Sequence, residues 1–247
     1  MIRDYVIATP MRIEWLAVRS THPFAMRTGM GAKASRRAAP RLAGAEAVVL
    51  AGFAAGMADT RPGDIVVASE VRAPDGTRHA CPDAEPLAAA LRGLLGASAR
   101  VVVGPVQTVD KLVRPAERAR LADEGVLAAE MEAAYVLAEA WQARWAMVRV
   151  VSDAPGHELV SPRIVPNGIR AYRTLKAAAP ALHGWLGEVA AERAQGDASA
   201  GSAGAAGGGA AAGSGPVPTP DGPGEADLGK GPGTESGQDG GDDVRPG

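Results

Sequence analysis

The sequence has little of what marks several specialised classes of protein. Its one cysteine, Cys81, excludes a disulfide framework within the chain and suits a reducing cytoplasm, where we expect the protein. Aromatic residues make up only 4%, so Val, Leu and Ala have to build the core. The formal net charge of −2 argues against nucleic acid as a partner. Arg12 and Glu14 interrupt the first apolar run, which therefore resembles neither a signal peptide nor a membrane anchor.

The four histidines show no spacing that resembles a metal site, and we expect neither a metal nor a cofactor. From Gln195 onward the chain is dominated by Ala, Gly, Ser, Pro and Asp. Such a segment buries too little apolar surface to offset the entropy lost on ordering it. We therefore predict a folded domain over residues 1–194 and a disordered tail over residues 195–247.

Segments typical of strands and of helices alternate along this domain. The apolar runs predict strands at 5–9, 24–28, 47–51, 64–69, 100–106 and 145–151. The segments rich in helix formers predict helices at 12–19, 34–42, 87–95, 115–123, 133–144 and 168–193. Asn167 is a candidate cap of the last helix, and Pro180 should kink or break it. The alternation predicts a three-layer α/β fold with a central twisted, mostly parallel mixed sheet flanked by helices.

Glycine-rich and acidic segments stand where several of these elements meet. In Gly52–Met57, Gly or Ala at four of six positions favours a loop whose backbone can approach a ligand closely. Glu130-Met131-Glu132 precedes the helix 133–144, and Ser152-Asp153 follows the strand after it. Ligands of open α/β sheets bind beyond the carboxyl ends of the strands. We therefore expect the two acidic segments to converge on one ligand, while residues 73–86 form a loop.

Three runs, GFAAGMADTRPGDIVVASEV, EMEAAYV and VRVVSDAPG, resemble in order and spacing the nucleoside phosphorylase superfamily. The chain is most similar there to methylthioadenosine/S-adenosylhomocysteine nucleosidases and to relatives from hopanoid gene clusters, from Tyr5 to about Ala177. The resemblance implies an α/β fold whose sheet closes partly on itself. It also implies a homo-oligomer, a dimer or larger, that cleaves the N-ribosidic bond of a purine nucleoside and releases the base. A 5′-substituted adenosine such as adenosylhopane follows from the resemblance alone.

The chemistry explains the residue types at the matching positions. Cleavage develops positive charge on the sugar and negative charge on the base. By resemblance Asp153, held by Ser152, protonates N7 of the purine, Glu132 binds the ribose hydroxyls, and Met131 packs against the sugar. Glu14 matches the base that orients an attacking water. Gly52, Phe53 and Met11 are further candidate substrate contacts.

Ordinary structural roles stand beside these. An Asp after a Ser at a strand end is often a turn or cap residue, and Glu132 could serve the dipole of the following helix. Glu14 could be a solvated residue of a surface helix.

The nucleophile is left open between water and phosphate. A phosphate site needs Arg, hydroxyl and backbone donors, and Arg12 and Lys33 are the candidate cations. Phosphorylases of the hexameric type, however, carry an Arg and a Ser where this chain has Leu50 and Phe53. These differences favour hydrolysis. A catalytically silent nucleoside-binding member of the family is the third reading, which the fold alone does not exclude.

Overall fold

The computed structural model describes residues 4–140, 142–156 and 164–206. The strands are β1 Tyr5–Thr9, β2 Ala25–Arg27, β3 Ala47–Gly56, β4 Ile65–Arg72, β5 Arg78–Ala80, β6 Val101–Thr108, β7 Ala128–Glu130 and β8 Arg144–Asp153. The α-helices are α1 Arg12–Val18, α2 Gly31–Ala38, α3 Ala84–Leu95, α4 Pro115–Asp123, α5 Ala133–Val136 and α6 Ile164–Ala206. Short 3₁₀ turns follow α2, α3 and α5 at Ala39–Leu42, Gly96–Ser98 and Leu137–Glu139.

All eight strands belong to one mixed sheet in the order β2-β1-β3-β7-β6-β4-β5, with β8 paired to both β3 and β4. Five of the strand pairings are parallel and three are antiparallel. Because β7 also joins β3 to β6, the strands β3, β8, β4, β6 and β7 form a closed ring. The predicted α/β fold is confirmed, including a sheet that closes partly on itself.

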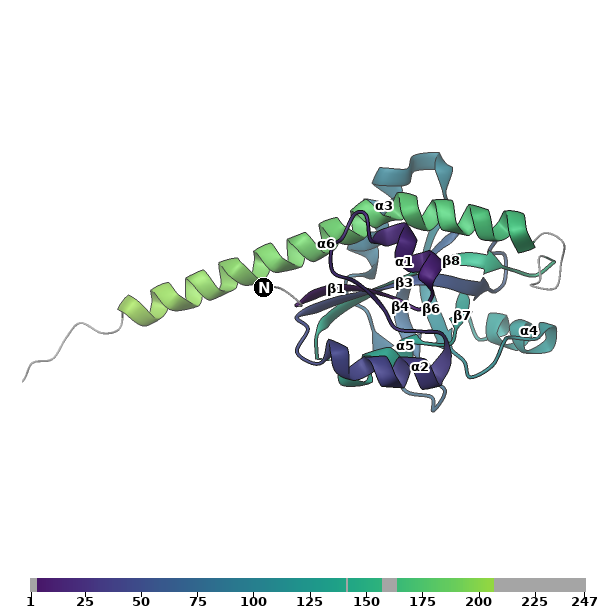
Figure 1. Ribbon diagram of the computed structural model, residues 1–247, viewed down its shortest axis with the longest axis horizontal. Coiled ribbons are helices and arrows are strands. Elements are labelled where there is room, and N and C mark those ends of the chain that lie inside the picture. The colour runs from purple at the N-terminus through teal and green to yellow at the C-terminus, as the bar shows by residue number, and fades with distance from the viewer. Residues whose placement is uncertain (1–3, 141, 157–163, 207–247) are drawn as a thin grey trace, which may run out of the picture. The chain divides into compact units, whose positions relative to one another are not determined.

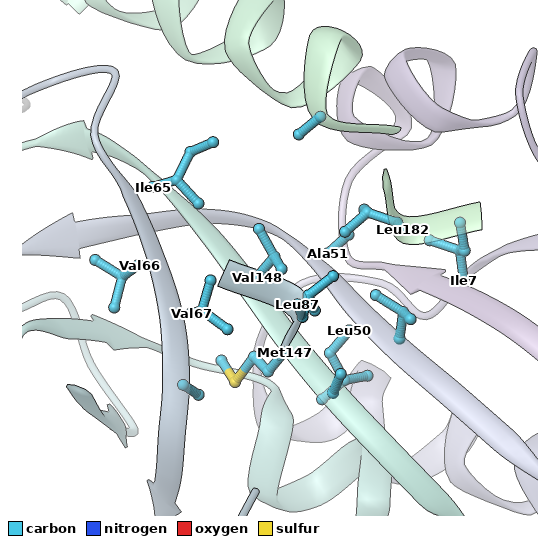
Figure 2. Packing of buried hydrophobic residues seen from close by; sticks show 14 of the residues in the cluster. Ile7, Leu50, Ala51, Ile65, Val66, Val67, Leu87, Met147, Val148 and Leu182 are labelled. Carbon is cyan, nitrogen blue, oxygen red and sulfur yellow. The ribbon is translucent and has the colours of Figure 1, made fainter. Parts of the chain in front are cut away.

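Helices cover the sheet on both sides (Figure 1): α3 and α6 lie on one side, and α2 and α5 lie on the other. Strand β3 is buried along nearly its whole length, as expected for a strand covered on both faces. Figure 2 shows the core from close by, where Leu182 of α6 and Leu87 of α3 accompany side chains of β1, β3, β4 and β8. Aliphatic side chains thus build the core, as the low aromatic content requires.

The prediction of a loop at Gly52–Met57 was wrong for most of its length, since β3 continues to Gly56. The reason is the partner strand: β8 pairs with β3 from Ala47 to Ala55 and holds the small residues extended. The small size of these residues instead lets neighbouring side chains pack closely against the backbone of β3. A Cβ on Gly56 would lie 2.7 Å from Val151 Cγ1 and 2.2 Å from Thr60 Oγ1.

Two other predicted elements differ from the structure. Residues 73–86 are not all loop, because β5 pairs antiparallel with β4 and α3 already begins at Ala84. The helix predicted over 133–144 is confined to α5 and the turn Leu137–Glu139. Arg144 pairs in register with Ala47, so the chain has to be extended again by that point. Pairing with β3 therefore overrides the helix propensity of the Ala-, Leu- and Glu-rich run.

The last helix is longer than predicted at both ends. It begins at Ile164, so Asn167 lies inside it and does not cap it, and it continues through Pro180 without a break. It runs to Ala206, beyond the boundary predicted at residue 194; residues 207–247 of the predicted tail lie outside the described residues. Within the described part of the chain, no helix combines the length and hydropathy needed to cross a membrane.

Candidate active site

A pocket of about 210 Å³ lies where β1, β6, β7 and β8 end, beside the second half of β3. Seven of the ten predicted site residues line it: Met11, Glu14, Phe53, Met131, Glu132, Ser152 and Asp153. The location is the one expected for a ligand of an α/β sheet, beyond the carboxyl ends of parallel strands. The structure therefore brings the two acidic segments and Glu14 together, as the sequence predicted.

The other three predicted residues do not line this pocket. Gly52 lies behind Glu14 in the middle of β3. Arg12 and Lys33 are exposed residues near the starts of α1 and α2. The two candidate cations of a phosphate site therefore do not line the pocket, because each side chain lies on the exposed side of its helix.

Glu14 is almost fully buried and accepts two backbone hydrogen bonds. Its Oε2 accepts a hydrogen bond from the N–H of Met11 (2.6 Å), the N-cap residue of α1. Its Oε1 accepts a hydrogen bond from the N–H of Phe53 (2.7 Å). The Phe53 N–H is available because β1 pairs with β3 only as far as Leu50, and β7 begins to pair at Ala55. Burial raises the pKa of Glu14 to about 7 against the opposing effect of these hydrogen bonds. A carboxyl group with such a pKa can act as a base near neutral pH.

Arg149 of β8 lies beside Gly52, as Glu14 does. A Cβ on Gly52 would lie 2.8 Å from Glu14 Oε1 and 2.9 Å from Arg149 Nη1, so only glycine leaves room for both groups. Arg149 Nη2 forms an ion pair with Glu130 Oε2 (2.7 Å), and both side chains are about 1% exposed. Within the part of the chain that the structure describes, its Nε and Nη1 have no hydrogen-bond partner. Unpaired buried donors are costly.

Glu130 and Glu132 have different surroundings although they are two residues apart. Glu130 accepts from Thr108 Oγ1 (2.6 Å), from two backbone N–H groups of the following turn, and from Arg149. These bonds make it a structural anchor. Glu132 accepts from the N–H of Gly31 (2.8 Å) at the start of α2. Burial and the neighbouring Glu130 raise its pKa, while Arg149 opposes the shift.

Asp153 lies at the end of β8, where the pairing with β3 shifts register between Ala54 and Ala55. Such a bulge turns the following side chain away from the regular alternation. Ser152 Oγ lies 3.1 Å from Asp153 Oδ1 and 3.3 Å from the carbonyl oxygen of Ala54. Asp153 Oδ2 forms an ion pair with Arg118 Nη2 of α4 (2.7 Å), and both side chains are buried.

The sequence analysis missed Arg118 and Arg149. Arg149 had a local signal: a charged residue inside an apolar run that was predicted to be a buried strand. Arg118 had none, because it lies on a short polar helix that also carries Arg120. Its partner is 35 residues away in the chain.

The rim of the pocket is mostly apolar. Met30 precedes α2, and Leu112 lies in the segment before α4; they are 67% and 65% exposed. Among the residues that the structure describes, Lys111 is the one cation that lines the pocket, and it is exposed. Among the described residues, no three His, Cys, Asp or Glu side chains are grouped in a way that could hold a metal ion.

The family model described as the phosphorylase superfamily matches residues 13–179 of this chain. No curated protein matches the chain in sequence. The matched range includes Glu14, Glu132 and Asp153.

Several solved structures share the fold. A methylthioadenosine/S-adenosylhomocysteine nucleosidase from Colwellia psychrerythraea 34H, in complex with adenine, superimposes with a TM-score of 0.62 at 20% identity, covering 73% of this chain and 94% of that chain. The corresponding nucleosidase from Campylobacter jejuni gives a TM-score of 0.61 at 16% identity, covering 72% and 96%. S-adenosylhomocysteine nucleosidase from Streptococcus pyogenes, in complex with 5-methylthiotubericidin, gives 0.56 at 19% identity, covering 71% and 95%.

Proposed function

The chain belongs to the phosphorylase superfamily, and we propose that it hydrolyses the N-ribosidic bond of an adenine nucleoside. The observation that carries the proposal is the convergence of Glu14, Glu132 and Asp153 on one pocket. Cleavage of this bond requires a proton donor to the base, a carboxylate near the sugar and a base for the nucleophile. The three carboxyl groups match these three needs, with Asp153 as acid, Glu132 as ribose ligand and Glu14 as base.

Water is favoured over phosphate by the charge around Arg149. Its guanidinium is paired with Glu130 and interacts electrostatically with Glu14 and Glu132, so three carboxyl groups surround one cation. A phosphate dianion brought to this place would meet excess negative charge, and desolvating an unpaired charge is costly. A neutral water molecule meets no such penalty. It could donate a hydrogen bond to Glu14, which lines the pocket.

Adenine as the leaving base is supported by the complexes of the similar nucleosidases. The Colwellia psychrerythraea nucleosidase was solved with adenine. An aspartate-to-asparagine variant of the Helicobacter pylori nucleosidase, 16% identical, holds 5′-methylthioadenosine in its active site. The exposed apolar rim at Met30 and Leu112 favours an apolar group at the 5′ position of the ribose. Adenosylhopane, named from the resemblance, is one nucleoside of this kind.

The test is incubation of the protein with 5′-substituted adenosines, with and without phosphate, while free adenine is measured. We expect adenine release at a rate that does not depend on phosphate, and phosphorus NMR should show no sugar 1-phosphate. A ribose 1-phosphate resonance, with a rate that rises with phosphate, would instead establish phosphorolysis. The exposed Lys111, which lines the pocket, would then be the candidate cation of its anion site.

If no adenosine derivative releases adenine, but adenine or a nucleoside binds the protein in calorimetry, the chain is a nucleoside-binding member of the family. The proposal of hydrolysis would then be wrong. The same preparation can be examined by size-exclusion chromatography, where we expect a homo-oligomer; the exposed Ile13 and Leu16 of α1 support this expectation.

A further inference from the structure

The proposed proton donor, Asp153, lies against a buried cation that the proposed mechanism does not yet use. Arg118 Nη2 is 2.7 Å from Asp153 Oδ2, and the two side chains are 7% and 6% exposed. Arg118 Nη1 donates to the carbonyl oxygen of Gly56. Gly56 and Asp153 are the last residues of β3 and β8, so one guanidinium binds the ends of two paired strands. A planar guanidinium with two engaged nitrogens fixes the position of its partner more tightly than a single ammonium group does.

The ion pair creates a chemical problem for an acid catalyst. A nearby cation favours the ionised form of a carboxyl group, whereas a proton donor has to be protonated before it acts. The same cation becomes favourable once the proton has left, because it then neutralises the carboxylate that remains in a buried place. The arrangement therefore suits stabilisation of the carboxylate that remains after the proton has been transferred.

We propose that Arg118 is a positioning residue for Asp153, which holds this carboxyl group in the pocket wall and stabilises the carboxylate left after proton transfer. The inference rests on the proposed function. In the reaction, the C1′–N bond breaks and its electron pair passes to the base, which takes the proton of Asp153. The oxygen of water bonds to C1′ and gives a proton to Glu14. Asp153 returns to its ion pair with Arg118. Before the next cleavage, Glu14 releases its proton to solvent and Asp153 takes up a proton from solvent.

The position of Arg118 in the chain extends its effect to the pocket rim. Arg118 lies in the first turns of α4. The segment 109–113, shortly before this helix, contributes Val109, Lys111, Leu112 and Val113 to the pocket. The ion pair therefore ties this segment to the end of β8. Loss of the pair should affect both proton transfer and the fit of the nucleoside.

Other ionisable groups share the pocket with Asp153, and a pH experiment has to account for them. They are Glu14 of α1, Glu130 at the end of β7, Glu132 after it, and the exposed Lys111. Within the described residues, Arg118 is the one cation within ion-pair distance of Asp153. All these groups are unchanged in the variants compared below, so differences between variants report on the Arg118–Asp153 pair.

The first experiment compares adenine release by the wild type, Arg118→Met, Arg118→Lys and Arg120→Met over pH 5 to 10. Arg120 is the matched control, since it lies on the same helix in an exposed ion pair with Glu124. We expect Arg118→Met to lower kcat by about tenfold or more, or one unit of log rate, as for impaired general acid catalysis. Arg118→Lys should restore part of the lost rate, and Arg120→Met should match the wild type.

The second experiment measures thermal unfolding and needs no activity. A buried carboxylate without its partner destabilises the fold, so Arg118→Met should lower the melting temperature at pH 8 by about 6 °C or more. Adding Asp153→Asn to Arg118→Met should relieve this loss at pH 8.

The inference is overturned if Arg118→Met behaves like Arg120→Met in the activity profile. A loss of melting temperature that Asp153→Asn does not relieve also overturns it, since Arg118 would then act through packing alone. Absence of adenine release from the wild type contradicts the proposed function instead, and the thermal experiment still tests the ion pair.

Discussion

At the scale of single residues, Glu14 shows how one side chain meets a structural and a chemical demand. It closes the first turn of α1 through the N–H of Met11, and it fills the gap between the β1 and β7 pairings of β3 through the N–H of Phe53. Both bonds fix its carboxylate in place. Since each oxygen retains a second lone pair, the group can still accept a proton from a ligand.

The raised pKa of Glu14 leads to a prediction about pH. A general base is active when it is deprotonated, and burial raises the pKa of Glu14 to about 7. We therefore expect kcat/KM to rise with pH through about 7 and to level off above it. Glu14→Gln should lower the rate by ~10² or more and remove this acidic limb. Steady-state adenine release across the pH range measures both, with circular dichroism as the control for folding. An acidic limb that persists in Glu14→Gln would assign it to another group.

Asp153 leads to a prediction about chemistry without loss of binding. Asp153→Asn keeps the size of the side chain but cannot supply an acidic proton, so we expect the rate of adenine release to fall by about 10²–10⁴. Nucleoside binding should persist, and isothermal calorimetry can measure it. A variant that keeps more than about a tenth of the wild-type turnover would contradict the role of Asp153 as general acid.

At the scale of elements, α6 is fixed to the rest of the domain by apolar packing and by a pair of histidines. Buried side chains from Ala171 to Val189 face the core. His183 of α6 lies with its Nδ1 2.9 Å from Nδ1 of His22, whose Nε2 is 3.0 Å from the carbonyl oxygen of Tyr5. A carbonyl can only accept, so His22 carries its proton on Nε2 when neutral and accepts from His183.

This pair makes the docking of α6 sensitive to acid. Burial lowers the pKa of His22, and the neighbouring His183 lowers it further. The unfolded chain, with a histidine pKa of about 6.5, then binds the proton more readily than the folded one. The stabilisation from the neutral ring is complete above about pH 6.5 and is lost as the pH falls below it.

Urea unfolding at pH 7.5 and 5.5 measures the effect. We expect the free energy of unfolding to fall on acidification, and to fall less in His22→Gln, which cannot be charged. Equal losses in the two proteins would show that other groups govern the acid sensitivity.

At the scale of the whole molecule, we expect the domain to fold without the residues that follow the buried part of α6. Residues 191–198 of α6 are exposed, and Val189 is the last buried residue described. Truncation after Gln195 keeps the ion pair between Arg193 and Glu46 (3.3 Å). We therefore expect the melting temperature and activity to change little, within about 2 °C for the former.

Truncation after Pro180 is the matched control, because it removes the buried Leu182, Trp185, Leu186 and Val189 and should strongly destabilise the domain. A fall of several degrees after the Gln195 truncation would show that the remainder of the chain docks on the domain.

Much of this protein follows from local sequence. The bounds of β1 and α4 are those predicted, because an apolar run stopped by Pro10 and a helix opened by Pro115 are set by neighbouring residues. The motifs around Glu132 and Asp153 also placed their carboxyl groups at the ends of strands. The pocket could therefore be predicted from the sequence, together with seven of the residues that line it.

Only the tertiary structure decided how the charges in that pocket are balanced. Arg118 reaches Asp153 across 35 residues of chain, and Arg149 reaches Glu130 across 19. The extension of β3 to Gly56 and the early end of α5 likewise depend on the pairing of β3 with β8. These features arise from strand pairing and from the need to neutralise buried charge, which are properties of contacts between distant segments. Local propensity carries no information about them, so they appear only once the sheet is assembled.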